Sequence, residues 1–305
     1  MQLIPVKKTK KLISRSFINN HMKPQIPIII EDFVDPESPA FKKWNYEYFK
    51  EIAGSQKVDI YGSEMDSMDR VASQPIAQTT FSEYLDLIDS TPTEHRLFLF
   101  NLLSIKPELK NDLIYNDVTN GKILKWLPFM FFGGQGSATR NHIDIDMSHV
   151  FITQFEGIKR IWLFPWEQSD LMYKLPYNFH SLPNIKTPDY RQYPALLYLN
   201  GYEAVLHPGE TLYIPSGWWH YIQYETGGYS VSVRALPSSF LEKWRGFKNL
   251  VITRNFDNIM RNIFKEKWFR YKVKAAKRRG TKAFKKQKAF SSESFLYSVM
   301  YKLNL

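Results

Sequence analysis

Short apolar runs separated by glycine or proline dominate residues 127–236. Examples are PFMFFGG, VFITQFEG, KRIWLFP, TLYIPSG and YSVSVRAL, which are rich in β-branched and aromatic side chains. Such runs are too short for core helices, and their recurrence every 8–12 residues or so is typical of a small barrel or jelly roll. The pattern therefore predicts a mainly β core over residues 127–236.

The segments on either side have a different character. Residues 1–126 combine β-rich runs, IPIIIEDF and RLFLFNL, with helical patterns in AFKKWNYEYFKEIAG, KPELKNDLIY and TFSEYLDLID, the last with Thr80 as N-cap and Glu83 three residues on. Residues 237–305 predict helices, capped by Ser238 or Ser239, that lead into a basic tail. We therefore expect three parts: an N-terminal α/β elaboration (1–126), the β core (127–236) and C-terminal helices (237–305).

The composition restricts the chemistry. The chain has no cysteine, which excludes disulfides, thiolate metal sites and cysteine nucleophiles, so any metal must be held by histidine and carboxylates. The N-terminal MQLIPVKKTKKLISRS lacks the apolar run of a signal peptide, and no later segment is apolar for long enough to span a membrane. These features predict a cytoplasmic protein with no membrane contact.

The net charge of +11 is concentrated at one end of the chain. Residues 241–305 contain 18 Lys/Arg and 4 Asp/Glu, whereas residues 1–240 contain 23 and 26. Contact with RNA or the ribosome is therefore a hypothesis for the C-terminal tail, KVKAAKRRGTKAFKKQK, which has aromatic residues nearby. The alternative is a solvated basic helix.

An H-x-D pair, His142 and Asp144 in NHIDIDMS, is followed 78 residues later by His220 in LYIPSGWWHY. On a strand, side chains at i and i+2 point to the same face. A histidine from another strand would complete a two-His-one-carboxylate triad, which is typical of non-heme Fe(II) oxygenases because it leaves coordination positions open. The predicted metal ligands are therefore His142, Asp144 and His220, with Asp146 as an alternative carboxylate.

Lys159 is the second informative residue. In GIKRIWLFP, Lys159 shares one strand face with two aliphatic residues, and Arg160 shares the other with two aromatic residues. Both faces look buried, so one of these cations must lie among apolar groups, which is costly unless an anion pairs with it. A dicarboxylate cosubstrate would supply that anion; alternatively, the lysine extends to solvent.

Residues 127–236 resemble the JmjC/cupin-like branch of the Fe(II)- and 2-oxoglutarate-dependent oxygenases. The resemblance rests on TRNHID, GIKRIWLFP, NGYEAVLHPGETLYIPSGWWHYI and GGYSVSV, and within the branch it is greatest to the asparaginyl hydroxylase that modifies hypoxia-inducible factor. It implies a double-stranded β-helix with N-terminal and C-terminal additions. It also implies Fe(II) held by the His142, Asp144 and His220 side chains, and 2-oxoglutarate whose distal carboxylate binds Thr139 and Lys159.

Two positions depart from the family pattern. A tyrosine that contacts the distal carboxylate of 2-oxoglutarate falls on Phe98, and an asparagine near its other carboxylate falls on Arg234. An inward Arg234 would pair with a cosubstrate or substrate carboxylate, and so counts as a candidate cosubstrate-binding residue. Alternatively, Arg234 ends its strand in solvent.

The resemblance implies hydroxylation of a C–H bond, with a protein or peptide side chain as the first candidate substrate. The alternatives are hydroxylation of a modified tRNA base or a small molecule, and a non-catalytic metal-binding cupin-like module, which the two departures favour. Candidate walls of the substrate site are Trp218 and Trp219, and Tyr173 and Tyr177 in a long loop over residues 167–200.

The C-terminal helices are a candidate dimer interface. In related enzymes the helices after the barrel mediate dimerisation. The apolar spacing of Phe247, Val251, Phe256, Met260 and Phe264 permits a homodimer of this kind here.

Overall fold

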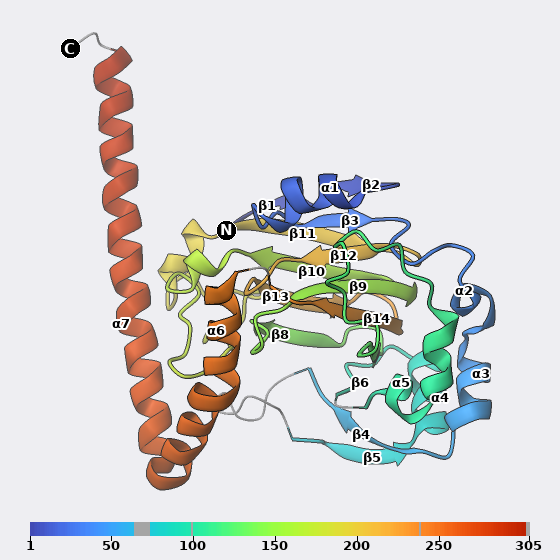
Figure 1. The fold of residues 1–305 in the computed structure, drawn as a ribbon. Helices are drawn as coiled ribbons and strands as arrows, with labels where there is room; N and C mark the ends of the chain where they lie inside the picture. The colour runs from blue at the N-terminus through green and yellow to red at the C-terminus, as the bar shows by residue number, and fades with distance from the viewer. Residues whose placement is uncertain (64–73, 99, 238, 303–305) are drawn as a thin grey trace.

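The computed structural model (Figure 1) describes residues 1–63, 74–98, 100–237 and 239–302, with side chains up to residue 290. Two sheets form the β core of these residues. The first has the order β1 (Gln2–Pro5), β11 (Asn200–Leu206), β10 (Lys159–Phe164), β13 (Trp219–Tyr224) and β8 (Ala138–His142). The second has the order β2 (Lys8–Thr9), β3 (Ile28–Ile30), β12 (Thr211–Ile214), β9 (His149–Glu156), β14 (Gly228–Ala235), β7 (Phe129–Gly133), β6 (Arg96–Leu97), β4 (Lys57–Tyr61) and β5 (Ala77–Thr80).

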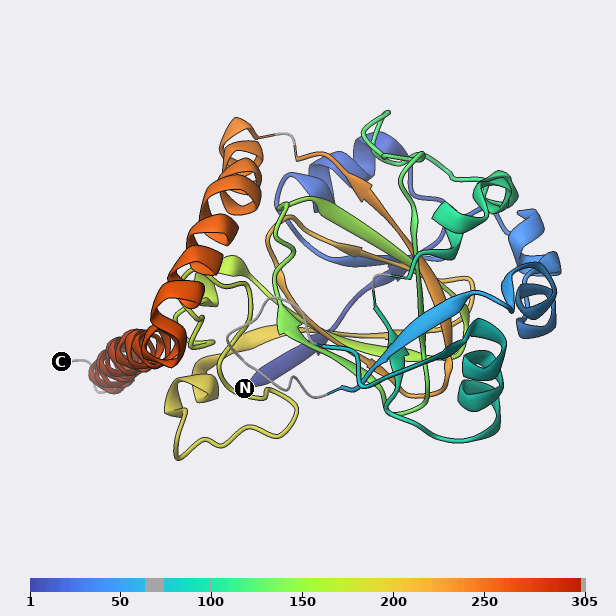
Figure 2. The same ribbon diagram turned by 90° about the horizontal axis from the view of Figure 1, so that it is seen from below.

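The two sheets curve around a common interior (Figure 2), which is the jelly-roll arrangement predicted from the spacing of the apolar runs. Strand register fixes which side chains enter this interior. In the β10–β13 pair, Lys159 lies opposite Tyr224 and Leu163 lies opposite His220. Because alternate residues of a strand share a face, all four side chains belong to one face of the sheet. Ile161 and Leu206 lie on the same face, and Leu212 and Ile214 of the second sheet belong to the same buried cluster.

The N-terminal part extends the second sheet and packs helices against its outer face. The helices are α1 (Ser14–Phe17), continued by a π-helical turn (Ile18–Met22), α2 (Pro39–Lys43), α3 (Tyr46–Ala53), α4 (Phe81–Ser90), α5 (Leu102–Ile105) and a 3₁₀ helix (Pro107–Asp112). Their apolar residues and the outward residues of β7, β9 and β14 form one large core, in which the rings of Phe49, Phe132 and Tyr229 meet edge to face or tilted.

Local signals explain where these elements begin and end. Thr80 and Glu83 form the predicted capping box of α4. The single helix expected over AFKKWNYEYFKEIAG is two helices, because Asn45 leaves the helical conformation and accepts a hydrogen bond from the Tyr48 amide at 2.9 Å. RLFLFNL is a strand only at Arg96–Leu97, with residue 99 outside the described part, and KPELKNDLIY forms the 3₁₀ helix instead of an α-helix.

The C-terminal segment is a helical hairpin. It runs from α6 (Phe240–Lys248), after Ser239, through a π-helical turn (Asn249–Thr253) into α7 (Arg254–Lys302), which reverses direction at Lys265 (φ 46°, ψ −124°). The arm after this residue runs back past the barrel (Figure 1). Buried Asp257 joins the two arms, because its Oδ1 accepts from Trp268 Nε1 (2.8 Å) and from Lys272 Nζ (2.9 Å).

The loop between β10 and β11 lies between the barrel and α7 (Figure 2). It contains 3₁₀ turns at Trp166–Gln168 and Pro194–Tyr198. Gly280 lies against the ring of Tyr173 so closely that a Cβ atom would clash, and the Tyr198 and Phe284 rings are 5.8 Å apart. The glycine thus permits close packing of α7 on the loop.

None of the helices in the described part of the chain is both long enough and apolar enough to cross a membrane. The cytoplasmic location and the division of the chain at residues 126 and 236 stay predictions.

Candidate metal centre

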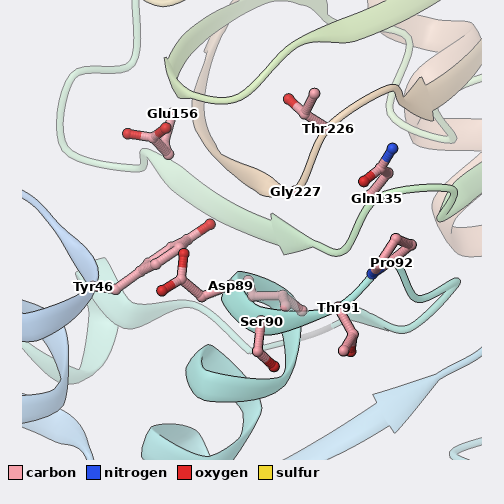
Figure 3. Close-up of a pocket in the computed structure, with 10 residues that line it drawn as sticks. Tyr46, Asp89, Ser90, Thr91, Pro92, Gln135, Glu156, Thr226 and Gly227 are labelled. Carbon is pink, nitrogen blue, oxygen red and sulfur yellow. The ribbon is translucent and has the colours of Figure 1, made fainter.

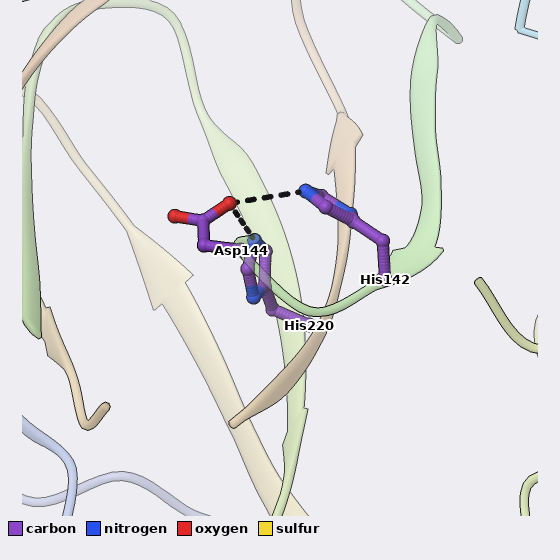
Figure 4. A group of neighbouring side chains, drawn as sticks. All are labelled: His142, Asp144 and His220. Atoms are coloured by element: carbon purple, nitrogen blue, oxygen red, sulfur yellow. Dashed lines mark ion pairs between the residues drawn. The ribbon is translucent and has the colours of Figure 1, made fainter. Parts of the chain in front are cut away.

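The three predicted metal ligands lie together at one end of the barrel interior (Figure 4). His142 ends β8 and pairs in register with His220 of β13, and Asp144 lies two residues beyond the end of β8. One ligand atom from each residue lies within 4.8 Å of the others. Oδ1 of Asp144 is 3.6 Å from Nε2 of His142 and 3.8 Å from Nε2 of His220. This donor set fits one metal ion.

Backbone carbonyls orient both imidazole rings. Nδ1 of His142 lies 2.8 Å from the Arg140 carbonyl oxygen, and Nδ1 of His220 lies 3.1 Å from the Trp218 carbonyl oxygen. A carbonyl accepts hydrogen bonds only, so Nδ1 of each neutral ring must carry the proton. Each Nε2 therefore directs a lone pair at the space beside Asp144, as metal ligation requires.

The protonation states also suit a metal. Burial lowers the pKa of His220 to about 4, with a smaller effect in the same direction from His142. Burial alone would raise the pKa of Asp144, but the charge of Arg234, together with the two neighbouring histidines, outweighs it and holds that pKa well below its usual range. At neutral pH, His220 is neutral and Asp144 is ionised, which are the ligating forms.

Arg234 points inward, as one of its two predicted orientations requires, and pairs with carboxylates of the chain itself. Its Nη1 lies 3.1 Å from Oδ2 of Asp144, 2.8 and 2.9 Å from the two oxygens of Asp146, and 2.9 Å from Oγ of Ser148. Asp144 thus turns Oδ1 to the histidines and Oδ2 to the guanidinium. Asp146 lies outside the ligand group in the structure and neutralises Arg234 instead.

A protein-family model described as a cupin-like domain matches residues 14–259. The chain belongs to the cupin-like domain family. The match begins well before residue 127, in keeping with the N-terminal strands that extend the second sheet of the cupin-like barrel.

Named relatives belong to the JmjC type of cupin-like protein. The chain is 27% identical over 231 residues to lysine-specific demethylase 8 of Xenopus tropicalis (71% of this chain, 49% of that protein). It is 29% identical over 242 residues to lysine-specific demethylase JMJ30 of Arabidopsis thaliana (74% and 54%). It is 24% identical over 258 residues to tRNA wybutosine-synthesizing protein 5 of Homo sapiens (78% and 80%). The chain therefore spans about half the length of these two demethylases.

The JmjC/cupin-like oxygenase family predicted from the sequence is thus confirmed at the level of the family. Its cofactors are Fe(II) and 2-oxoglutarate, and the His–Asp–His group of this chain could bind the metal. The closer likeness to the hypoxia-inducible-factor asparaginyl hydroxylase stays a prediction.

Lys159 is buried in the interior of the cupin-like barrel, at the opposite end of β10 and β13 from His220. Its Nζ donates to Ser230 Oγ and lies 4.3 Å from the centre of the Tyr224 ring. Among the described residues no carboxylate lies within ion-pair distance of it, and burial lowers its pKa to about 7. The lysine therefore does not extend to solvent, and a buried cation without an anionic partner fits one end of a bound dicarboxylate.

Thr139 and Phe98 have different surroundings. Thr139 is half-buried on β8 and pairs in register with Ile222, between His220 and Tyr224 on the inward face of β13. Phe98 packs edge-on against the Tyr61 ring, and the Arg96 guanidinium lies 5.4 Å from its ring centre. Phe98 has no hydroxyl. The phenol that lies beside Lys159 belongs to Tyr224.

The expected substrate walls need correction. Trp219 and Tyr173 are buried: the indole of Trp219 donates to Ser169 Oγ at 3.0 Å, and the Tyr173 hydroxyl accepts from the Ala195 amide at 3.2 Å. Both pack between the barrel and the loop, so neither forms an open wall. Trp218 is buried in the interior cluster. Tyr177 alone of the four is exposed, at 40%.

An open pocket of about 270 Å³ lies away from the metal centre (Figure 3). Its lining includes Tyr46, Asp89, Glu156, Thr226 and Gly227, beyond the end of β13 that is remote from His220. It contains two carboxylates and no basic side chain. A dicarboxylate cosubstrate therefore has no partner there, and the pocket is not part of the metal site.

Two features of the site were not predicted from the sequence. The pairing of Arg234 with Asp146 required the register of β14 against β9, which no local pattern specifies. Tyr224 could have been found, because it lies four residues after His220 and therefore shares its strand face.

Proposed function

We propose that this chain is an Fe(II)- and 2-oxoglutarate-dependent hydroxylase in which His142, Asp144 and His220 hold the iron. The observation that carries the proposal is the combination of a convergent His–Asp–His group with a buried, anion-free Lys159 in the same interior. His220 is four positions along β13 from Tyr224, the residue opposite Lys159, which is roughly 13 Å of strand. A five-carbon dicarboxylate and the lysine side chain together suit that span.

In this proposal the interior side chains bind and orient the cosubstrate. Lys159 pairs with its distal carboxylate, and Thr139, on the neighbouring strand, donates a hydrogen bond to the same group. When bound, Fe(II) supplies the redox chemistry by which 2-oxoglutarate and O₂ become succinate and CO₂ while a C–H bond of the substrate becomes C–OH. The aliphatic lining excludes water from the reacting atoms.

Arg234 is a positioning residue in this scheme rather than a cosubstrate ligand. The guanidinium engages Oδ2 of Asp144, which leaves Oδ1 for the metal, and Asp146 cancels the cationic charge beside the dication. We therefore expect Asp146→Asn to weaken Mn(II) binding, measured by calorimetry, by about 10-fold or more, in the range found for groups that support a metal ligand.

Ser148→Ala is the matched control for this variant. It removes a hydroxyl that contacts both Arg234 and Asp146 but changes no charge, so the expected loss of Mn(II) affinity is much smaller. Equal Mn(II) affinities for Asp146→Asn and Ser148→Ala would show that charge compensation by Asp146 is unimportant.

The first candidate substrate is a protein or peptide side chain, as for the relatives named as lysine-specific demethylases. Mass spectrometry of proteins and of RNA from cells with and without this chain tests the assignment. A modification equal to one oxygen atom, found on a protein only in the presence of the intact chain and lost with Asp144→Ala, is the expected result. The same modification found on RNA alone would overturn the protein substrate.

Hydroxylation of an RNA base is a second candidate, favoured by the basic residues of α7 and by the relative named for tRNA wybutosine synthesis. A small-molecule substrate and a non-catalytic metal-binding module are the remaining alternatives. Measurement of succinate formation separates a non-catalytic module, which would form none, from a hydroxylase that acts on protein, RNA or a small molecule.

We also propose that two copies of the chain associate through the C-terminal helices. Large apolar side chains stand exposed along α6, the π-helical turn after it and the first arm of α7, including Phe240 (83%), Phe247, Val251, Ile259 and Ile263 (64%). An exposed apolar surface of this extent marks an interaction site. A second copy would cover it, as in the related enzymes whose post-barrel helices dimerise.

Light scattering tests this association. We expect the wild-type chain to have twice the mass of one chain and Phe247→Glu/Ile263→Glu to have the mass of one, because two buried carboxylates are costly at an apolar interface. The control is Lys243→Glu, which changes an exposed residue on α6, the helix that also carries Phe247. A single-chain mass for the wild type at micromolar concentration would contradict the proposal.

A further inference from the structure

Three cations meet where the 167–199 loop contacts α7, outside the metal centre. Lys174 comes from the loop and Arg278 and Arg279 from α7, and they surround an open pocket of about 330 Å³ that Tyr177 and Tyr271 also line. Among the described residues only Asp170 comes within ion-pair distance of these cations, 3.9 Å from Nε of Arg279. The pocket therefore has an excess of positive charge.

Two of these cations also fix the backbone of the pocket. Arg279 donates to the carbonyl of Lys174 at 2.5 Å, and the Lys174 Nζ donates to the carbonyl of Asn178 at 2.8 Å. Nε of Arg279 is buried and makes no hydrogen bond. Burial and the charge of Arg279 lower the pKa of Lys174 to about 8. An anion in the pocket would relieve this repulsion and supply an acceptor.

Aromatic side chains form one wall of the pocket. The Trp268 ring stacks on Tyr271, with centroids 5.1 Å apart, and is tilted against Tyr177, with centroids 5.5 Å apart. Tyr271 is 52% exposed, so its outer face is open to another ring. Cations next to an exposed aromatic face are the recurring elements of single-stranded nucleic-acid sites, where bases stack and phosphates pair.

The cationic surface continues along α7 as a basic stripe of exposed side chains. Intervals of three or four residues place its members on one helix face over about 30 Å. Glu266 is the only acidic residue in the sequence between positions 258 and 292. The members of the stripe are Lys267, Arg270, Lys274, Arg278, Lys282, Lys285 and Lys288, so Arg278 belongs to both the pocket and the stripe.

The position of the stripe favours nucleic acid over a membrane surface. A helix that binds a membrane needs an apolar face free to enter the lipid. The other face of α7 is already covered, because Ala276 and Gly280 are buried against the loop and Phe284 packs on Tyr198. What the arm of α7 after Lys265 presents outward is mainly charge, with a few aromatic rings.

The pocket is also close to the metal centre. Tyr177 and His180 are three positions apart in the sequence, a span of at most about 10 Å. His180 forms a backbone bridge with His142, and their rings are 5.8 Å apart. A strand held in the pocket would thus pass beside the metal centre.

We propose that this junction binds single-stranded nucleic acid, with a phosphate among Lys174, Arg278 and Arg279, a base on Tyr271, and the strand continuing along the basic stripe. Binding of this kind requires no turnover, so it is tested independently of the oxygenase function.

The test is fluorescence anisotropy of a labelled single-stranded RNA dodecamer with the full chain, without added iron, over a range of salt concentrations. Arg278→Glu is expected to weaken binding about 10-fold or more and to reduce the salt dependence, since each phosphate contact contributes about one to its log–log slope. Tyr271→Ala is expected to weaken binding about 10-fold and to leave the salt dependence unchanged, because stacking carries no charge.

Lys57→Glu on β4 is the control, because it makes the same charge change at an exposed position on the other side of the barrel. Thermal unfolding of each variant checks that the fold is kept. Equal losses for Arg278→Glu and Lys57→Glu would overturn the proposal. Displacement of the RNA by polyglutamate or inorganic phosphate, at a concentration of negative charge equal to that of the RNA, would overturn the proposal too. The site would then bind any anion.

Discussion

His142→Ala is expected to remove measurable Fe(II) binding and, with it, all turnover of 2-oxoglutarate. The triad supplies three ligand atoms within 4.8 Å of one another, and the loss of one leaves a two-ligand site open to water. Changes to groups that merely support a ligand already cost about 10–100-fold in metal affinity, so loss of a ligand should cost more. Calorimetric titration with Fe(II) under anaerobic conditions, or with Mn(II), measures the effect.

His207→Ala is the matched control, since His207 is exposed and lies in the turn before β12. It should bind metal as the wild-type chain does. If His142→Ala bound Fe(II) or Mn(II) within a few-fold of the control, the metal would have to lie elsewhere, and the assignment of the triad would be wrong.

Lys159→Met is expected to have the second large effect, on 2-oxoglutarate. Removing the buried cationic partner of a carboxylate should reduce the binding free energy of 2-oxoglutarate by roughly 3 kcal/mol or more. At about 1.4 kcal/mol per factor of ten, this corresponds to about 100-fold weaker binding. Without cosubstrate the same change should leave the thermal stability equal or higher, because methionine fills the site without an unpaired charge. A lysine with only a structural role would not produce weaker 2-oxoglutarate binding together with equal or higher thermal stability.

Arg160→Met is the control for this variant. Arg160 lies next in sequence but faces outward, where it pairs with Glu203 at 2.8 Å and Glu225 at 2.5 Å. Its loss should lower stability slightly and leave the Kd of 2-oxoglutarate unchanged. If Lys159→Met and Arg160→Met bound 2-oxoglutarate equally well, the barrel interior would not be the cosubstrate pocket.

The low pKa of Lys159, about 7, gives this pairing a pH dependence. The folded value lies below the unfolded value of 10.5, so this group favours the folded state above pH 10.5, and that contribution is lost as the pH falls through about 7. Cosubstrate binding has the opposite sign, because only the ammonium pairs with a carboxylate. The affinity for 2-oxoglutarate should therefore fall as the pH rises from about 7 to 9, with proton uptake on binding, and Lys159→Met should abolish this dependence.

Local patterns in the sequence were sufficient for the barrel, the triad and the buried lysine. Alternation along a strand places Lys159 with Ile161, and the H-x-D spacing brings His142 and Asp144 to one side, even though β8 ends at His142. The capping box at Thr80 is equally local. The apolar runs, the H-x-D pair and the capping box are each short local patterns, and only His220, 78 residues after His142, belongs to a distant one.

Features that depend on long-range packing could not be predicted. The partners of Arg234 follow from the register of β14 on β9, and the burial of Tyr173 and Trp219 follows from how the loop docks between the barrel and α7. The reversal of α7 at Lys265 also lacks a sequence signal, since no proline or glycine marks it. As a result, Tyr173 and Trp219 are core residues rather than walls, and the cationic pocket at the junction of loop and helix was missed.

The central claim, that the barrel interior is the active site of an oxygenase, is tested most directly by succinate formation. The full chain with Fe(II), ascorbate and 2-oxoglutarate is expected to release succinate in an O₂-dependent manner, even without its substrate, and to do so faster once that substrate is added. Lys159→Met should need far more 2-oxoglutarate, and His142→Ala should give none. Succinate no higher than the His142→Ala background, from a wild-type chain that binds both metal and 2-oxoglutarate, would contradict the claim and leave a non-catalytic cupin-like module.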